Sequence, residues 1–241
     1  MWNDVRAAFS FLTILPLGYV QGRKPGWSFA WYPLVGLVIG GTLALIAAFS
    51  PFNASVTALL ILLAWVIFTG GLHLDGFGDA CDGLLATVEP SQRLAIMKDP
   101  RTGTWAVVGL ILLLLGKWTT LATVPPTLLI VPPVAGRWAM VCAAYAYPYA
   151  RQSGLGAYFR EGLGGGQVAS ASAIALLTVI LIARELLLVL IIVSVAVLAV
   201  TLIGRWAAHR LDGGLTGDVY GALCELTELL CLLGLSAWVK G

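Results

Sequence analysis

The chain carries very little charge. Only 11% of its 241 residues are Asp, Glu, Lys or Arg, whereas 59% are hydrophobic. A soluble domain usually contains about 25% charged residues, so this composition excludes an ordinary soluble protein. The net charge of +2 gives no electrostatic reason to expect nucleic acid as a partner. A mean hydropathy of +0.93 indicates instead a protein that lies mostly within a lipid bilayer.

Cysteine and histidine are also scarce. The four cysteines lie in or beside apolar segments without C-x-x-C spacing, so the sequence indicates neither a disulfide framework nor a zinc site. The two histidines, His73 and His209, each lie beside carboxylates, and either could act as a general base or a metal ligand. No soluble domain, repeat or low-complexity linker is visible. We therefore expect residues 1–241 to form a single polytopic membrane domain.

Long apolar runs predict an all-α integral membrane protein, a bundle of about seven transmembrane helices. The runs are Trp27–Phe49, Ala54–Leu72, Thr104–Val124, Leu128–Pro148, Val168–Ala183, Leu186–Gly204 and Val219–Val239. The segment Met1–Val20 precedes them and lacks the small-x-small site of a signal peptide. We expect it to form a short helix that lies in the membrane interface or is partly inserted.

Basic residues predict the orientation of these helices. If the N-terminus is cytoplasmic and the runs alternate, most basic side chains fall inside, and only Arg184 and Lys240 fall outside. This bias favours a cytoplasmic N-terminus. The loops 75–103, 149–167 and 205–218 would then all open on the cytoplasm. They hold nearly every polar group that could perform chemistry.

The richest polar segment follows the second apolar run. Gly70–Gly83 contains a histidine and three aspartates, Asp75, Asp79 and Asp82, which share one face if the segment is helical. Carboxylates this close repel one another, and a bound cation or protonation relieves the repulsion. These aspartates could therefore hold a cation at the membrane surface.

Basic residues follow the acidic cluster. Arg93, Lys98 and Arg101 precede the next span and suit a phosphate group, which Arg binds in a bidentate manner. The alternative is that they are juxtamembrane anchors whose charged ends reach the lipid headgroups. The next cytoplasmic loop, 151–167, is rich in glycine, which permits either close approach to a ligand or a flexible connection.

The last loop leads into a helix that carries acidic residues. Asp218 and Glu225 are seven residues apart and share a helical face, and Glu228 follows them. Carboxylates in a span usually face a cavity, a partner or a cation. They could therefore ligate a metal, or they could form structural ion pairs with Lys117 or Arg137.

Three blocks of sequence together resemble one enzyme family. They are G-G-x-H-x-D-G-x-x-D-x-x-D-G at 70–83, M-K-D-x-R-x-G-T at 97–104 and G-G-x-T-G-D-x-x-G-A-x-x-E-x-x-E at 213–228. Their order and spacing are similar to those of the cobalamin synthases, the adenosylcobinamide-GDP ribazoletransferases of bacteria. The resemblance implies a multi-pass, Mg²⁺-dependent enzyme of the cell inner membrane. Its substrates would be adenosylcobinamide-GDP and α-ribazole or the 5′-phosphate of α-ribazole, and it would release GMP.

A second likeness is weaker. Residues 79–86 are similar to the opening D-x-x-D-G-x-x-A of the CDP-alcohol phosphotransferases of phospholipid synthesis. Thr87 replaces the usual arginine, and the second aspartate pair of that family is absent. Any second carboxylate group would have to come from Asp99, Asp212, Asp218 or Glu225. An ion-coupled transporter is a further alternative, although the acidic residues cluster at helix ends and no inverted repeat is evident.

These observations combine into one expected site. The expected metal ligands are Asp75, Asp79, Asp82, Asp218 and Glu225. The expected substrate-binding residues are Arg93, Lys98, Arg101 and Arg210. The expected catalytic residues are Asp82, His73 and Asp218. A ribazole hydroxyl would attack the phosphorus on the cobinamide arm, with positioning and charge neutralisation as the main contributions of the protein. Self-association into a homo-oligomer is compatible with the sequence.

Overall fold

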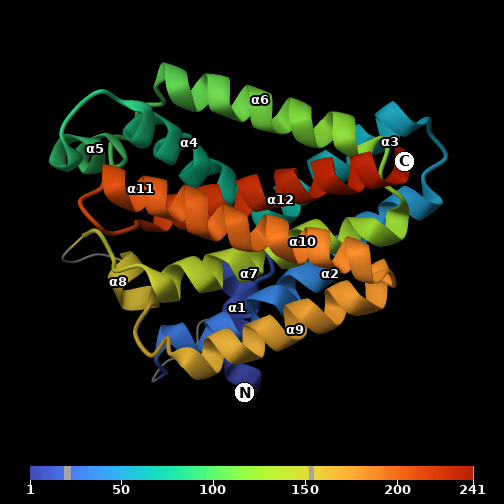
Figure 1. The fold of residues 1–241 in the computed structure, drawn as a ribbon, viewed down its shortest axis with the longest axis horizontal. Coiled ribbons are helices and arrows are strands. Elements are labelled where there is room, and N and C mark those ends of the chain that lie inside the picture. Colours follow the sequence, from blue (N-terminus) through green and yellow to red (C-terminus); the bar gives the residue numbers. More distant parts are fainter. Residues whose placement is uncertain (19–22, 152–154, 241) are drawn as a thin grey trace.

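A computed structural model describes residues 1–18, 23–151 and 155–240, and the described chain is almost entirely helical. In chain order the elements are α1 (Trp2–Leu12), η1 (Pro25–Trp31), α2 (Tyr32–Phe49), α3 (Ala54–Thr69), α4 (Leu72–Leu85), α5 (Pro90–Ile96), α6 (Thr104–Leu121), η2 (Pro126–Ile130), α7 (Val131–Ala146), α8 (Leu155–Phe159), α9 (Gly165–Ala183), α10 (Leu186–Leu198), η3 (Ala199–Ile203), α11 (Gly204–Arg210) and α12 (Gly217–Lys240). Figure 1 shows the long helices running side by side as a bundle.

The predicted spans are confirmed. Six helical segments of the described chain are long and apolar enough to cross a membrane, and the bent pair α3–α4 makes a seventh. Many large apolar side chains point outward from these spans, among them Leu112, Leu181 and Leu187, which are more than half exposed. Such an apolar outer surface suits contact with lipid and not with water. The chain is therefore an all-α, multi-pass membrane protein.

The helix α3 ends where two successive glycines bend the chain. Gly70 and Gly71 have φ values of 62° and 68°, in the left-handed region where a side chain costs free energy. Helix α4 begins directly after them and turns 90° from α3. Residues 75–85 therefore belong to a helix and not to the loop predicted there. The three aspartates of the Gly70–Gly83 segment all lie on α4.

Helix α4 packs closely against the first turns of α12. A Cβ atom added at Gly76 would lie 3.1 Å from the Asp218 backbone, and one added at Gly221 would lie 3.2 Å from the His73 carbonyl oxygen. The two glycines thus let the α4 and α12 backbones approach at the level of the acidic residues. This contact brings the first and third sequence blocks together.

The polar ends of several elements gather at one end of the bundle. Figure 1 shows α5, α8 and α11 at this end, on the left, while the α2–α3 turn and the C-terminus lie at the opposite end. The basic residues assigned to the cytoplasm from α5 onward thus lie at one end, as a multi-pass topology requires. The N-terminal segment forms α1, as predicted, and packs against η1 and α2. Arg23 donates to both carboxylate oxygens of Asp4, at 2.7 and 2.9 Å.

Candidate active site

A cavity of about 410 Å³ lies toward this polar end, where residues of α4, α8, α12 and the 149–151 segment line it together with side chains of α1, η1, α2 and α7. Its charged lining consists of Asp75, Lys98, Arg151, Arg160 and Asp218. The remaining lining is mainly aromatic and includes His73. A cavity of this size, with few polar groups on an apolar wall, has the usual form of a small-ligand site.

Carboxylates from two helices meet at the cavity. Asp75 of α4 and Asp218 of α12 both line it, and Asp79 interacts electrostatically with Asp75, Asp82 and Asp218. Among the described residues, no three Asp, Glu, His or Cys side chains converge closely enough to hold a metal by themselves. Mg²⁺ commonly takes only one or two protein carboxylates and completes its shell with water and substrate phosphates. One or two of the Asp75, Asp79 and Asp218 carboxylates would match that donor pattern together with substrate phosphates.

Asp82 is oriented differently from the other aspartates of α4. Its two carboxylate oxygens accept hydrogen bonds from the backbone N–H groups of Gly103 at 2.7 Å and Ala106 at 2.9 Å. The side chain therefore caps the N-terminus of α6, whose first amides lack partners within the helix. Asp82 fixes the 97–104 block to α4, a positioning role that was not predicted from the sequence.

A short backbone pairing positions Arg151 beside Asp218. Ala150 N–H donates to Leu215 O and Leu215 N–H donates to Pro148 O, both at 2.9 Å. This pairing fixes the 148–151 segment beside the turn that precedes α12. The Arg151 Nη2 then lies 3.0 Å from the Asp218 carboxylate, and Thr216 Oγ1 lies 3.1 Å from the same oxygen.

Arg93 and Arg210 have a structural role at the end of α4. Arg93 Nη1 donates to the carbonyl oxygens of Leu84 at 3.0 Å and of Ala86. Arg210 donates to the same two carbonyls, at 3.0 and 2.9 Å. The last carbonyls of an α-helix have no partner within the helix, so these two arginines cap the C-terminus of α4. Neither residue lines the cavity.

Lys98 and Arg101 also differ in position. Lys98 lines the cavity as the sequence led us to expect of a substrate-binding residue. Arg101 instead donates through Nε and Nη2 to the Asp99 carboxylate at 2.9 and 2.6 Å, and its side chain is 87% exposed. Hydrogen bonds from Arg101 lower the pKa of Asp99 to about 2. The pair therefore remains ionised at physiological pH.

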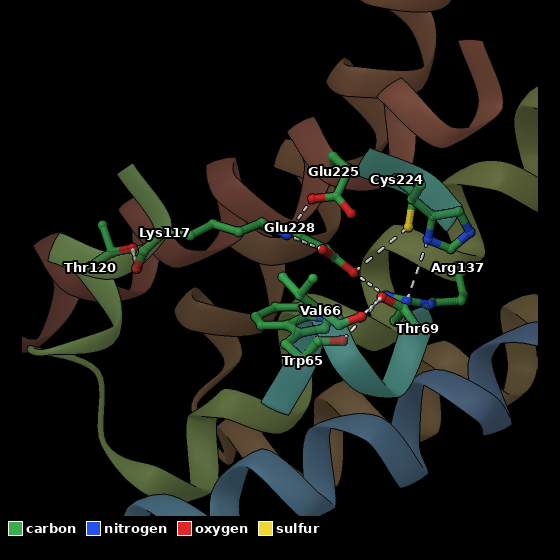
Figure 2. Close-up of polar contacts among 10 residues, drawn as sticks. Trp65, Val66, Thr69, Lys117, Thr120, Arg137, Cys224, Glu225 and Glu228 are labelled. Atoms are coloured by element: carbon green, nitrogen blue, oxygen red, sulfur yellow. Dashed lines mark hydrogen bonds and ion pairs between the residues drawn. The ribbon is translucent and has the colours of Figure 1, made fainter. Parts of the chain in front are cut away.

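Glu225 lies in a buried charge network with Lys117 and Glu228 (Figure 2). Lys117 Nζ lies 2.6 Å from Glu225 Oε2 and also contacts Glu228. Glu228 in turn contacts Arg137, and both side chains are fully buried. The network holds two cations and two anions and is thus balanced, which a buried cluster requires. The ion-pair alternative for Glu225 matches this arrangement, and the expectation of Glu225 as a metal ligand is not carried further.

Sequence reasoning missed two cavity residues, Arg151 and Arg160. The Nε atom of each is buried and has no hydrogen-bond partner among the described residues. Each guanidinium thus keeps an unused donor on a side chain that lines the cavity, and guanidinium groups suit an anionic ligand. The available signal was the glycine-rich segment between them, where close approach to a ligand and a flexible connection could not be separated.

The fold and the site together define a helical membrane protein with a cavity that carboxylates, arginines and aromatic side chains line. The family model for cobalamin-5-phosphate synthase matches residues 4–236. The chain belongs to this family, and it is a transferase of cobalamin biosynthesis.

Curated relatives cover nearly the whole chain. An adenosylcobinamide-GDP ribazoletransferase of Deinococcus radiodurans is 40% identical over 242 residues, which cover 98% of this chain and 86% of the relative. Proteins of the same name from Roseiflexus sp. and Geotalea daltonii are 37% and 40% identical and cover 95% of this chain. No solved structure gives a significant match.

Proposed function

We propose that the protein joins adenosylcobinamide-GDP to α-ribazole, or to α-ribazole 5′-phosphate, and releases GMP. One observation carries the proposal: carboxylates and unused arginine donors line a single cavity that continues into an aromatic wall. Arginine donors bind a diphosphate ester, carboxylates bind a divalent cation, and an aromatic wall packs against an aromatic base. The names of the relatives supply the identity of the substrates.

The charged residues would have two separate roles in phosphoryl transfer, which are metal binding and diphosphate binding. Asp75, Asp79 and Asp218 would hold Mg²⁺, which would neutralise phosphate charge as the leaving GMP departs. Arg151, Arg160 and Lys98 would bind the diphosphate. Asp82 keeps the 97–104 segment, and with it Lys98, against α4. The protein thus contributes mainly position and charge.

The direct test is an assay of the purified protein in lipid nanodiscs. With Mg²⁺, adenosylcobinamide-GDP and α-ribazole, we expect adenosylcobalamin and GMP in equal amounts. The alternative enzyme class predicts product from CDP-diacylglycerol and an alcohol. Turnover of CDP-diacylglycerol without any cobalamin product would overturn the proposal.

The division of the basic residues gives a second prediction. We expect Arg151→Lys to reduce kcat/KM for adenosylcobinamide-GDP by about tenfold to a hundredfold, because Lys cannot replace a bidentate guanidinium. Arg101→Lys is expected to keep nearly normal kinetics, since Arg101 is paired with Asp99 outside the cavity. Arg205→Lys, at an exposed position of α11, is the matched control. A larger loss of kcat/KM in Arg101→Lys than in Arg151→Lys would indicate that Arg101, and not Arg151, binds the diphosphate.

We also propose that the cavity end faces the cytoplasm of the bacterial inner membrane, as the basic residues indicate. In a cysteine-free background, Ala95→Cys on α5 and Phe52→Cys in the α2–α3 turn place exposed thiols at opposite ends. An impermeant maleimide applied to intact cells, with the outer membrane permeabilised, should label Phe52→Cys and should label Ala95→Cys only after lysis. The opposite pattern would invert the topology.

A further inference from the structure

The aromatic part of the cavity is not explained by phosphate or metal binding. Phe29 and Tyr32 are stacked with ring centroids 4.4 Å apart, and Phe11 lies 4.5 Å from Phe159. All four side chains line the cavity, as does Tyr220. Aromatic walls bind flat, apolar ring systems through stacking and edge contacts. This part of the cavity is therefore suited to a heteroaromatic ring.

His73 contributes a buried polar atom to this wall, as Tyr32 and Tyr220 do through their hydroxyl groups. Its side chain is only 2% exposed, it lines the cavity, and its Nε2 atom has no hydrogen-bond partner among the described residues. A buried polar atom without a partner carries a free-energy cost. A ligand that pairs with Nε2 would remove that cost.

The contact of the other ring nitrogen of His73 determines whether Nε2 carries the ring proton. Nδ1 lies 3.5 Å from Nη2 of Arg137, and a guanidinium can only donate, so Nδ1 must be the acceptor. The ring proton then resides on Nε2. Arg137 is itself held by the fully buried Glu228. The contact with Arg137, a member of the buried network of Figure 2, thus makes Nε2 of His73 a hydrogen-bond donor and not a base, on a side chain that lines the cavity.

We propose that this aromatic part of the cavity binds the base of the acceptor nucleoside, and that His73 Nε2–H donates a hydrogen bond to its free ring nitrogen. The inference rests on the proposed function. A benzimidazole linked to ribose through one nitrogen has no N–H group and only one in-plane acceptor, the second nitrogen. A donor in an aromatic wall matches that ring, whereas the N–H groups of guanine suit the charged part of the cavity, where Asp75 and Asp218 offer acceptors. The GDP moiety would then occupy the charged part of the cavity.

The test is a binding measurement with two small probes, 1,5,6-trimethylbenzimidazole and 1,5,6-trimethylindole. They differ only in the ring nitrogen, which is replaced by C–H in the indole. We expect the wild-type protein in nanodiscs to bind the benzimidazole about tenfold more tightly, the value of one net hydrogen bond. His73→Phe should abolish this preference while affinity for the indole stays close to that of the wild type.

Three variants separate the hydrogen bond from general packing. His73→Gln keeps an N–H donor and should retain part of the preference. Phe29→Leu should weaken binding of both probes without changing their ratio. His209→Phe alters the exposed second histidine, outside the cavity lining, and should behave as the wild type.

Two results would overturn the subsite. One is equal binding of the two probes by the wild type, a result that does not depend on the folding of any variant. The other is an unchanged preference in a folded His73→Phe protein. The transfer assay with adenosylcobinamide-GDP is run in parallel. Normal transfer without a probe preference would contradict only the proposed subsite. A probe preference without transfer would contradict the proposed function.

Discussion

Replacing Asp75 with asparagine is expected to lower kcat by about two to three orders of magnitude at saturating Mg²⁺, the effect typical of losing one preorganised charged group. Asp75 is exposed, lines the cavity, and acts electrostatically on both Asp79 and Asp218. Removing its charge relieves repulsion within the acidic cluster. Thermal stability should therefore stay constant or rise while turnover falls. A residue with a purely structural role would show the opposite combination.

The control for Asp75→Asn is Asp212→Asn. Asp212 is exposed, lies in the turn before α12 and has a φ of 61°, which asparagine tolerates well. The substitution removes the same charge at the same end of the bundle and should leave turnover unchanged. Near-normal turnover by Asp75→Asn would contradict the metal assignment. Asp82→Asn is less informative, because one amide cannot accept through both positions from Gly103 and Ala106.

The helices were predictable because their signal is local. A span requires about 20 apolar residues, and each such run in the sequence corresponds to a helix of the bundle. The i, i+4, i+7 spacing of Asp75, Asp79 and Asp82 implied a shared face only if the segment was helical, and residues 75–85 were assigned to a loop. The bend at Gly70–Gly71 was not predicted, since glycine pairs occur both in loops and at helix ends.

The assignment of the basic residues was less predictable because their partners are distant in sequence. Arg93 and Arg210 lie 117 positions apart by number, yet both donate to the Leu84 and Ala86 carbonyls. The need to cap α4 exists only once the fold brings α5 and α11 beside it. Arg151 shows the converse, because its position at Asp218 depends on the backbone pairing near Leu215. The distribution of basic residues among the loops therefore predicted the polar end of the bundle, but it did not predict which arginines line the cavity.

The buried network carries the second large effect. We expect Glu228→Gln to destabilise the folded protein by about 3–5 kcal/mol, because it leaves Arg137 buried without its carboxylate partner. Glu225→Gln should cost less, since Lys117 keeps its contact with Glu228. Steric trapping or denaturation in mixed micelles measures the free energy of unfolding. Glu185→Gln, at an exposed position beyond α9, is the control and should be neutral.

A double variant separates charge balance from function. Arg137→Met with Glu228→Leu removes one cation and one anion and leaves Lys117 paired with Glu225. Buried ion pairs replaced by apolar residues often cost little, so most of the lost stability should return. The benzimidazole preference should not return, because His73 has lost the arginine that fixes its tautomer. Recovery of both properties would show that Arg137 acts only through stability, and recovery of neither would place the damage in packing between α7 and α12.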